Sequence, residues 1–470
     1  MSACCHLTRR QLLGWAGLVA ATPIVGAFGD IERAYALPGP GMLACNLELV
    51  TVTDTSAVLT WFTGDPSQID ESGRFAPVPA DTEVLLGTST RTLRTVLHDS
   101  TKTPYHYAEI TGLEPGETYT FVARSNGVFA TPSVSTTGSP LGTSDAALRF
   151  GTPQPPPGDH IMSIALTNDL HLGETVAGLA TTQQGIELPP GIRQRDGLPP
   201  YPEVMAGAMV REAHERGARQ LLVAGDVSAE AKAVDVEKAK SYLESFDGDY
   251  LVARGNHDRV HTNQPDTFKQ TFFGDGPTWQ TARVGQLRIV GLDTYDKTGN
   301  GGDNGVLSAE QFAFVKGELA RDPERPTIVF GHHPVSLESS VTTTEPLIFD
   351  LDQQQARQLE DLYAQSPGVF LHHAGHTHRN KRTIAPGAPG VVFQEVAATK
   401  EYPGGFMLLR LHTGGYALNH YKLRDPQAQE WAERSRPEYG GLAPFYTYGN
   451  RSDRNTVVER DLSDLKHHGG

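Results

Sequence analysis

Short motifs rich in metal-ligand side chains occur five times along this chain, and each directly follows an apolar run of the kind that forms a buried strand. In chain order, the motifs are Asp169-Leu170-His171, Gly225-Asp226, Gly255-Asn256-His257-Asp258, Gly331-His332-His333-Pro334 and Gly375-His376-Thr377-His378. Open α/β sheets bind their ligands just beyond the carboxyl ends of their strands. The motifs therefore predict an α/β fold in which five strand ends converge on one site.

The segments between the motifs alternate between short apolar runs and longer runs with helical spacing. Strands are predicted before the motifs at residues 161–167, 221–224, 250–253, 327–330 and 369–371, and elsewhere at 287–292 and 391–393. Residues 201–220 are predicted to form a helix, because Met205, Met209 and Ala213 lie on one face, and residues 229–246 a second helix. This alternation is typical of an α/β domain, which we place at residues 160–421.

The motifs combine carboxylate and amide oxygens with imidazole nitrogens, the ligands that a two-metal hydrolytic site needs. Asp226 has two carboxylate oxygens and could bridge two cations. The other predicted ligands form two sets, with Asp169, His171 and His378 for one cation and Asn256, His332 and His376 for the other. Mixed nitrogen and oxygen ligands suit iron, manganese, zinc or nickel. We therefore predict two divalent or mixed-valence metal ions and leave the element open.

Residues beside the predicted ligands offer further chemistry. His257 directly follows Asn256 and could protonate the leaving oxygen of a substrate, while Asp258 could orient His257. These two are the predicted catalytic residues. Three arginines also adjoin the motifs and could either contact phosphate or serve in ion pairs: Arg254, Arg259 and Arg379.

At these motifs the chain resembles the calcineurin-like metallophosphoesterase superfamily, over about residues 160–421. The superfamily pattern D-x-H, G-D, G-N-H-D/E, H-x-P and G-H-x-H matches the five motifs without a gap. The resemblance implies an αββα fold, which is a β-sandwich flanked by helices with a dimetal centre at one edge. It also implies that His257 does not bind metal, and that the substrate is a small-molecule phosphate ester.

The resemblance leaves the choice between diester and monoester open. Residues 307–312 and 395–405 resemble exported and cyclic-nucleotide-type phosphodiesterases, whereas the domain that precedes the motifs resembles that of purple acid phosphatases. Two features depart from the purple enzymes: His171 itself, and the run Asp226-Val227-Ser228-Ala229, which lacks their tyrosine ligand. The D-x-H form slightly favours a phosphodiesterase, with a phosphomonoesterase as the alternative. A third possibility is a non-catalytic, metal-stabilised surface-binding module, against which the complete ligand set and His257 argue.

The preceding domain, at residues 43–150, is predicted to be all-β. Runs rich in Thr and Val at residues 47–53, 57–62 and 81–87 predict strands. Residues 113–122 resemble the tyrosine corner of fibronectin type III domains, in which a Tyr hydroxyl ties a loop to its strand. We therefore expect an immunoglobulin- or fibronectin III-like sandwich with Trp61 in its core. A Pro-rich linker at 151–159 would join it to the α/β domain.

The N-terminus resembles a twin-arginine export signal. Arg9 and Arg10 precede an uncharged stretch at residues 12–29, and Ala34-Tyr35-Ala36 offers a small-x-small cleavage site. A membrane anchor formed by the same stretch is the alternative, but the stretch is only mildly apolar. We expect a signal peptide at 1–36, no stable membrane insertion, and a mature protein that is extracellular, in the cell wall or periplasmic.

Charge and cysteine content limit the partners. The chain has 55 Asp and Glu against 40 Lys and Arg, a formal net charge of −15, so we expect no binding to a nucleic-acid duplex. Cys45 would be the one cysteine left after cleavage at Ala36, which excludes an intramolecular disulfide. Residues 422–470 are charged and turn-rich, and we expect a tail that wraps the surface or is disordered. The oligomeric state stays open.

Overall fold

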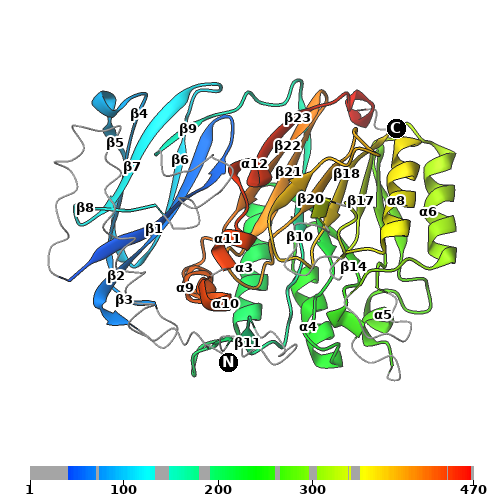
Figure 1. The fold of residues 1–470 in the computed structure, drawn as a ribbon, viewed down its shortest axis with the longest axis horizontal. Coiled ribbons are helices and arrows are strands. Elements are labelled where there is room, and N and C mark those ends of the chain that lie inside the picture. The colour runs from blue at the N-terminus through cyan, green and yellow to red at the C-terminus, as the bar shows by residue number, and fades with distance from the viewer. Residues whose placement is uncertain are drawn as a thin grey trace, which may run out of the picture.

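The computed structural model describes residues 41–69, 74–132, 148–178, 191–259, 265–295, 304–336, 338–339, 350–441 and 443–466. The predicted signal peptide, with its twin arginines and cleavage site, lies outside the described residues. Figure 1 shows two parts side by side, a β-sandwich built by the first third of the chain and a larger layered domain of strands and helices.

The first part consists of two antiparallel sheets. One has the order β1 (Leu43–Val52), β2 (Ser56–Ile69), β3 (Phe75–Pro77), with β6 (Tyr105–Thr111) also paired to β2. The other has the order β5 (Arg94–Thr103), β4 (Ala80–Gly87), β7 (Thr118–Ser125), β8 (Val128–Phe129), with β9 (Arg149–Gly151) also paired to β7.

The core of this sandwich contains the residues that the sequence analysis selected. Trp61 is buried between the sheets together with Leu59, Val84 and Phe121, and its indole N–H donates to Ser125 Oγ at 2.9 Å. The hydroxyl of Tyr119 accepts a hydrogen bond of 3.0 Å from the backbone N–H of Glu114. That bond ties the loop before β7 to the strand, as the predicted tyrosine corner requires.

The second part contains two mixed sheets. The first has the order β14 (Asp249–Ala253), β13 (Ala218–Ala224), β10 (His160–Thr167), β21 (Phe406–His412), β22 (Gly415–Tyr421), β23 (Asn455–Glu459). The second has the order β15 (Gln280–Val284), β16 (Leu287–Gly291), β17 (Thr327–Phe330), β18 (Val369–Ala374), β20 (Val392–Glu395), β19 (Lys381–Thr383). Strands β10, β13 and β14 run parallel to one another, as do β16, β17, β18 and β20.

Alternation along the strands explains why these sheets pack face to face. In β10, Ile164 and Leu166 enter the core between the two sheets, whereas Ala165 packs on the helical side. Helices α3 (Tyr201–Glu215) and α4 (Ala233–Glu244) cover the first sheet, and α6 (Ala309–Arg321) and α8 (Gln353–Ala364) cover the second (Figure 1). The predicted α/β domain, with two sheets flanked by helices, is confirmed.

Both predicted helices are shorter than expected. The helix predicted at residues 201–220 ends as α3 at Glu215, because Gly217 adopts a φ of +85° and β13 already begins at Ala218. Two shorter helices and two short strands also lie between β10 and β15 in the described residues: η3 (His257–Arg259), α5 (Thr267–Phe272), β11 (Val176–Ala177) and β12 (Ile192–Arg193).

The segment after Tyr421 differs from the expected tail because it is folded into the domain. It forms α9 (Pro426–Ser435), α10 (Glu438–Gly441), α11 (Ala443–Thr447) and α12 (Arg451–Arg454), and then β23, which extends the first sheet by pairing with β22. Trp431 and Leu462 are buried. The guanidinium of Arg454 is buried as well and donates to the backbone carbonyl of Leu49 at 2.9 Å. Charged residues of the segment after Tyr421 therefore make contacts within the molecule.

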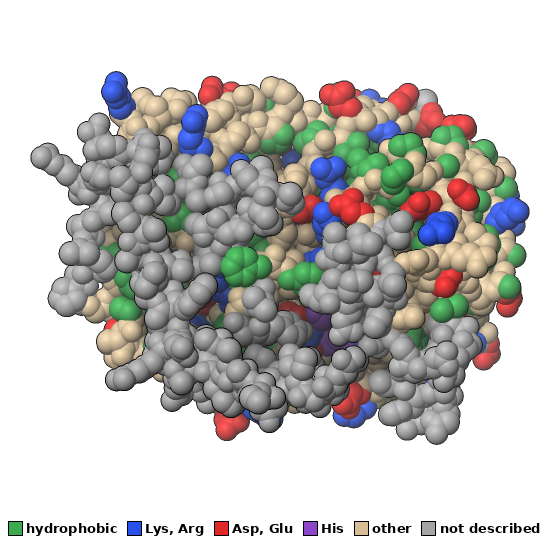
Figure 2. All heavy atoms as spheres, viewed as in Figure 1, with side chains coloured by type: hydrophobic (Ala, Val, Ile, Leu, Met, Phe, Trp, Pro, Cys, Tyr) green, Lys and Arg blue, Asp and Glu red, His purple; other side chains and the backbone are tan. Residues whose placement is uncertain are grey.

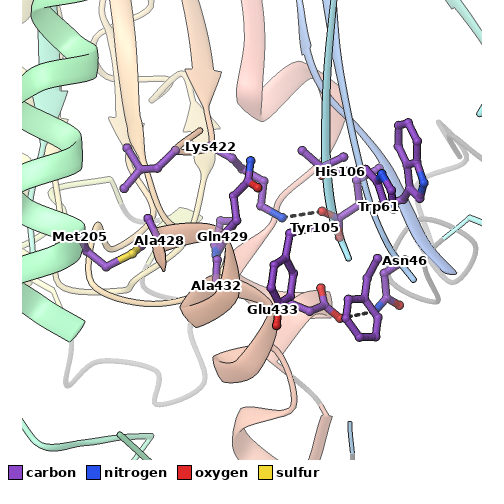
Figure 3. Close-up of a pocket in the computed structure, with 15 residues that line it drawn as sticks. Asn46, Trp61, Tyr105, His106, Met205, Lys422, Ala428, Gln429, Ala432 and Glu433 are labelled. Atoms are coloured by element: carbon purple, nitrogen blue, oxygen red, sulfur yellow. Dashed lines mark hydrogen bonds and ion pairs between the residues drawn. The ribbon is translucent and has the colours of Figure 1, made fainter. Parts of the chain in front are cut away.

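The N-terminal sandwich is docked onto the α/β domain through buried polar groups. Glu48 is only 1% exposed and accepts hydrogen bonds from Tyr402, Lys422 and Arg436. A cavity of about 40 Å³ lies at this junction, lined by residues of both parts (Figure 3). It has room for a small number of water molecules.

Two further expectations concern membranes and thiols. Within the described part of the chain, no helix is both long enough and apolar enough to cross a membrane. Cys45 is a free, half-buried cysteine, and burial raises the pKa of its thiol to about 12. Cys45 therefore stays protonated at neutral pH and is a poor nucleophile.

Candidate metal centre

The predicted ligands all lie in loops that directly follow parallel strands. Asp169 and His171 follow β10, Asp226 follows β13 and Asn256 follows β14, all in the first sheet. In the second sheet, His332 follows β17, while His376 and His378 follow β18. The two sheets therefore contribute ligands to one edge of the sandwich. Figure 2 shows histidine side chains (purple) gathered near the centre of one face.

Three of these side chains converge at a first position. His378 Nε2 lies 3.1 Å from Asp169 Oδ1, and His171 Nε2 lies 3.6 Å from the same oxygen. Asp226 Oδ2 is 3.4 Å from His171 Nε2. Ligands bound about 2.0–2.2 Å from one metal ion lie roughly 3.0–3.6 Å from one another. The spacing therefore fits a cation held between these atoms.

A second position lies on the other side of Asp226. His332 Nε2 is 3.2 Å from Asp226 Oδ2, 3.0 Å from Asn256 Oδ1 and 3.0 Å from His376 Nδ1. The same carboxylate oxygen, Asp226 Oδ2, thus faces both positions, which would allow it to bridge two cations. The structure brings together all seven predicted ligands in the two sets that the sequence suggested.

Backbone strain marks the same residues. Five predicted ligands adopt the left-handed conformation: Asp169 (φ +52°), His171 (φ +46°), Asp226 (φ +53°), His376 (φ +66°) and His378 (φ +53°). Residues other than glycine seldom adopt positive φ, and such strain gathers at functional sites. The loops therefore hold these side chains in orientations that an ordinary turn would not give.

Glycines allow the loops to approach one another closely. A Cβ on Gly375 would lie 2.7 Å from Asp169 Oδ2, and one on Gly225 would lie 2.7 Å from His332 Nδ1. A Cβ on Gly255 would clash with Oδ1 of Asp226. The glycine in each of these motifs is thus required by the space next to a predicted ligand.

The electrostatics of the site favour positive charge. Burial raises the pKa of a carboxyl group, but neighbouring imidazoles outweigh it and hold the pKa values of Asp169 and Asp226 well below their usual range. Burial lowers the pKa of an imidazole, yet Asp226 raises the pKa of His332 to about 9. Burial and the neighbouring His333 and His332 instead lower the pKa of His376. Carboxylates that stay ionised favour bound cations, and metal ions compete with protons for such ligands.

His257 and Asp258 have different surroundings from those expected. His257 Nδ1 donates to the carbonyl of Ala229 at 2.8 Å, which leaves Nε2 for other partners, and burial lowers the pKa of its imidazole. Asp258 was expected to orient His257, but its carboxylate instead accepts from the backbone N–H groups of Gly255 and Ser228, both at 3.0 Å. Asp258 therefore joins two ligand-bearing loops, and Ala229 orients His257.

His257 also lies close to the first position. Together with His171 and Asp226 it forms a group whose candidate ligand atoms all lie within 4.8 Å of one another. Its ring centroid is 4.5 Å from that of His171. Proximity to the predicted ligands is what a proton donor at this site would need.

The arginines beside the motifs serve in ion pairs. Arg254 pairs with Asp266 at 2.6 Å and also with Asp293, and Arg379 pairs with Glu395 at 2.7 Å. Arg259 lies 3.7 Å from Asp266. Of the two roles considered for these arginines, the structure supports the ion pair.

Carboxylates behind the histidines were missed by the sequence analysis. His378 Nδ1 donates to Glu401 Oε1 at 2.6 Å, and His171 Nδ1 lies 3.4 Å from Glu174 Oε2. A signal was available for Glu401, because it follows the predicted strand at residues 391–393, which is now β20. That strand is parallel to β18, so its carboxyl end lies at the same edge of the sheet.

Comparison with known proteins agrees with this geometry. Residues 162–380 match the model of the calcineurin-like phosphoesterase family. Over 221 residues, the chain is 24% identical to a Synechococcus protein named "Probable cyclic nucleotide phosphodiesterase", an alignment that covers 45% of this chain and 78% of that protein.

Two solved structures are also similar. A purple acid phosphatase from yellow lupin (Lupinus luteus) matches with a TM-score of 0.43 and 15% identity, covering 90% of this chain and 75% of that one. A dimetal phosphatase from Danio rerio matches with a TM-score of 0.42 and 13% identity, covering 56% of this chain and 96% of that one.

The family match spans the strands β10, β13, β14, β17 and β18, whose ends carry all seven predicted ligands. Residues 162–380 are thus similar to the calcineurin-like phosphoesterase family, and the protein is a metal-dependent phosphoesterase.

Proposed function

We propose that this protein is an exported dimetal phosphoric-ester hydrolase that prefers diesters. The observation that carries the proposal is the position of Asp226 Oδ2, 3.4 Å from His171 Nε2 and 3.2 Å from His332 Nε2. One carboxylate oxygen between two sets of ligands is the arrangement that a two-metal site requires.

Each group in the site then has a distinct role. Two bound metal ions would supply Lewis-acid polarisation of the phosphoryl oxygens and an activated water. The chain supplies the fixed framework, because strained loops and tight glycines hold the ligands before any ion binds. In its imidazolium form, with protons on both ring nitrogens, His257 would donate the Nε2 proton to the leaving oxygen and become neutral, while its Nδ1–H stays bonded to Ala229.

The charge around the site supports a diester over a monoester. At neutral pH a phosphate monoester carries a charge of about −1.5 to −2, whereas a diester carries a single negative charge. Arg254 and Arg379, which adjoin the motifs, are already paired with carboxylates. A substrate with less charge to neutralise suits this site better. The name of the Synechococcus relative points the same way.

The N-terminal sandwich is proposed to be fibronectin III-like and to act as a wall beside the catalytic domain. Support comes from the Tyr119 hydrogen bond, from the buried Trp61 and from the two-sheet order of its strands. Its role would be structural, since its buried polar contacts are made with the α/β domain. Phosphomonoesterase activity, which the resemblance to purple acid phosphatases suggests, remains the second candidate.

Assays with nitrophenyl esters, combined with metal analysis, test the catalytic proposal. The purified full-length chain should contain two metal equivalents and hydrolyse bis(nitrophenyl) phosphate with a higher kcat/KM than nitrophenyl phosphate. A higher kcat/KM on the monoester would favour the second candidate. A preparation that binds no more than one metal equivalent at saturation would rule out the two-metal site.

Export is proposed to use the twin-arginine route. The support is the pair Arg9 and Arg10 before an uncharged stretch, with Ala34-Tyr35-Ala36 after it. Replacing both arginines by lysine should keep the chain inside the cell in its uncleaved form, as seen by fractionation and mass analysis. Normal export of the double variant would point to another route or to an anchor.

A further inference from the structure

One lysine connects the carboxylates that lie behind two of the predicted ligands. Lys400 Nζ lies 2.6 Å from Glu174 Oε2 and 3.1 Å from Glu401 Oε2. Glu401 Oε1 in turn accepts from His378 Nδ1, and Glu174 Oε2 faces His171 Nδ1. The ammonium therefore joins the partners of both histidines of the first position.

The surroundings keep Lys400 in place. Lys400 is 3% exposed. Its backbone carbonyl accepts a hydrogen bond of 2.7 Å from the indole N–H of Trp431 in α9. Its backbone N–H donates to the carbonyl of Asp169 at 3.3 Å. A buried ammonium without carboxylate partners would be strongly unfavourable. Lys400 and its two glutamates therefore depend on one another for their placement.

Among the described residues, His332 of the second position has a different kind of partner. His332 Nδ1 donates to the backbone carbonyl of Ala224 at 2.8 Å, which is a neutral partner. Apart from Asp226, which both positions share, the carboxylates of Asp169, Glu174 and Glu401 stand near the first position, with the ammonium of Lys400 among them. A carboxylate behind an imidazole makes it a more basic and better oriented ligand than a carbonyl does.

We propose that Lys400, Glu174 and Glu401 are positioning residues that make the Asp169–His171–His378 position hold its metal ion more tightly than the Asn256–His332–His376 position. The inference rests on the two-metal site proposed above and adds an order of affinity to it. The three residues act through His171 and His378 and do not touch the substrate.

Chelator titration of the metal-loaded, full-length protein tests the proposal, with the bound metal measured by elemental analysis. The wild type should lose its two ions in two separate steps. The His332→Ala variant should lack the step at lower chelator concentration, which assigns that step to the second position. Two steps that coincide in the wild type would overturn the proposal.

Glu401→Gln is the first variant, because the amide keeps the size of the side chain and removes its charge. The affinity of the first position should fall by about 10- to 100-fold, and the step assigned to the second position should stay unchanged. Glu212→Gln is the matched control, since Glu212 is a buried carboxylate that accepts from the backbone N–H groups of Arg424 and Asp425. Its chelator titration should equal that of the wild type.

Lys400→Met distinguishes two possible effects of Lys400: holding Glu174 and Glu401 in place, and repelling the metal ion by its positive charge. If Lys400 acted only as a positive charge, its removal would tighten the binding of a cation to the first position. Positioning requires the opposite result, because Glu174 and Glu401 lose the group that holds them, so the step assigned to the first position should shift to lower chelator concentration. Tighter or unchanged binding would overturn the inference.

The two proposals fail in different ways. A wild type that binds fewer than two metal ions contradicts the two-metal function. A wild type with two ions whose first-position affinity does not respond to Glu401→Gln contradicts only the positioning role. Should Lys400→Met fail to fold, as judged by circular dichroism, Glu401→Gln alone decides the outcome, because it preserves the shape of the site.

Discussion

Asp226 is the residue on which both predicted metal positions depend. Its Oδ2 faces His171 and His332, while its Oδ1 accepts the backbone N–H of His257 at 2.8 Å. Asp226→Ala should therefore remove both ions or leave them loosely held, and activity should be lost with them. Elemental analysis after gel filtration measures this. Two full metal equivalents in the variant would contradict the bridging role.

His257 is expected to act on the proton and not on the metal. His257→Asn should keep both ions, while kcat falls by about 10²- to 10⁴-fold, the range for loss of a general acid. The loss should be greater for an alkyl ester than for a nitrophenyl ester, because nitrophenolate leaves with little need of a proton. Metal content and kcat on both substrates are the measurements. Loss of metal would make His257 a ligand, and equal losses of kcat on both esters would point to electrostatic stabilisation instead.

Asp258 should behave differently from His257, because it holds two loops together. Its carboxylate accepts backbone N–H groups of Gly255 and Ser228, and burial together with Asp226 raises its pKa to about 6. Asp258→Asn should therefore lower thermal stability and metal affinity together, with a similar loss of kcat on good and poor leaving groups. A loss that depends on the leaving group, as for His257→Asn, would restore the role in which Asp258 orients His257.

At the scale of the element, a glycine can be required for two reasons: because a side chain would not fit, or because the backbone adopts a positive φ. The motif glycine Gly255 is a case of the first reason. Gly255 follows β14 with no positive φ, yet a Cβ there would clash with Asp226. Gly255→Ala should therefore destabilise the protein by about 1–3 kcal/mol, as overpacking does, and weaken metal binding.

Gly317, inside α6, is the matched control because a Cβ there meets no atom within 4 Å. Gly317→Ala should stabilise by about 0.5–1 kcal/mol. Thermal unfolding of both variants checks the contrast, and equal effects would contradict it.

The strands and the ligands were predictable because short-range patterns encode both. An apolar run followed by a motif places Asp169 or Asp226 at a strand end, and parallel strands bring such ends together. The helix lengths were less predictable, because Gly217 ends α3 by a local turn inside an apolar pattern. The contact between Glu174 and Lys400 could not be read from the sequence, since the two residues lie 226 positions apart in the chain.

At the scale of the whole molecule, polar contacts between residues far apart in the sequence hold the N-terminal sandwich against the segment that follows Tyr421. Arg454 bonds to the carbonyl of Leu49 across 405 positions, and Asn46 bonds to Glu433 across 387 (Figure 3). Charged, turn-rich composition therefore gave a misleading picture of the segment after Tyr421. Two of its charged residues pair with residues of the N-terminal sandwich, Arg436 with Glu48 and Glu430 with Arg74, which no local pattern shows.

Glu48 offers a direct test of this docking. Burial raises the pKa of its carboxyl, but Lys422 and Arg436 outweigh burial and lower the pKa to about 2, from an ordinary value of 4.5. A carboxyl whose pKa is lowered by folding stabilises the folded state above the unfolded pKa. That contribution is lost as the pH falls from about 4.5 towards 2.

Glu48→Gln removes the charge and leaves two buried cations short of a partner. At pH 7 the variant should be less stable than the wild type by about 3–5 kcal/mol, the cost of breaking a buried ion pair from one side. The difference should shrink as the pH falls from about 4.5 towards 2, because the unfolded wild-type chain takes up a proton on Glu48 in this range, and the folded protein does so only near pH 2. Thermal unfolding of both metal-free proteins over a pH series measures this difference, with Glu109→Gln as a control for a half-buried pair between the same two parts, Glu109 with Arg216. A stability difference that stays constant from pH 7 to pH 3 would show that Glu48 contributes through its shape and hydrogen bonds, and not through its charge.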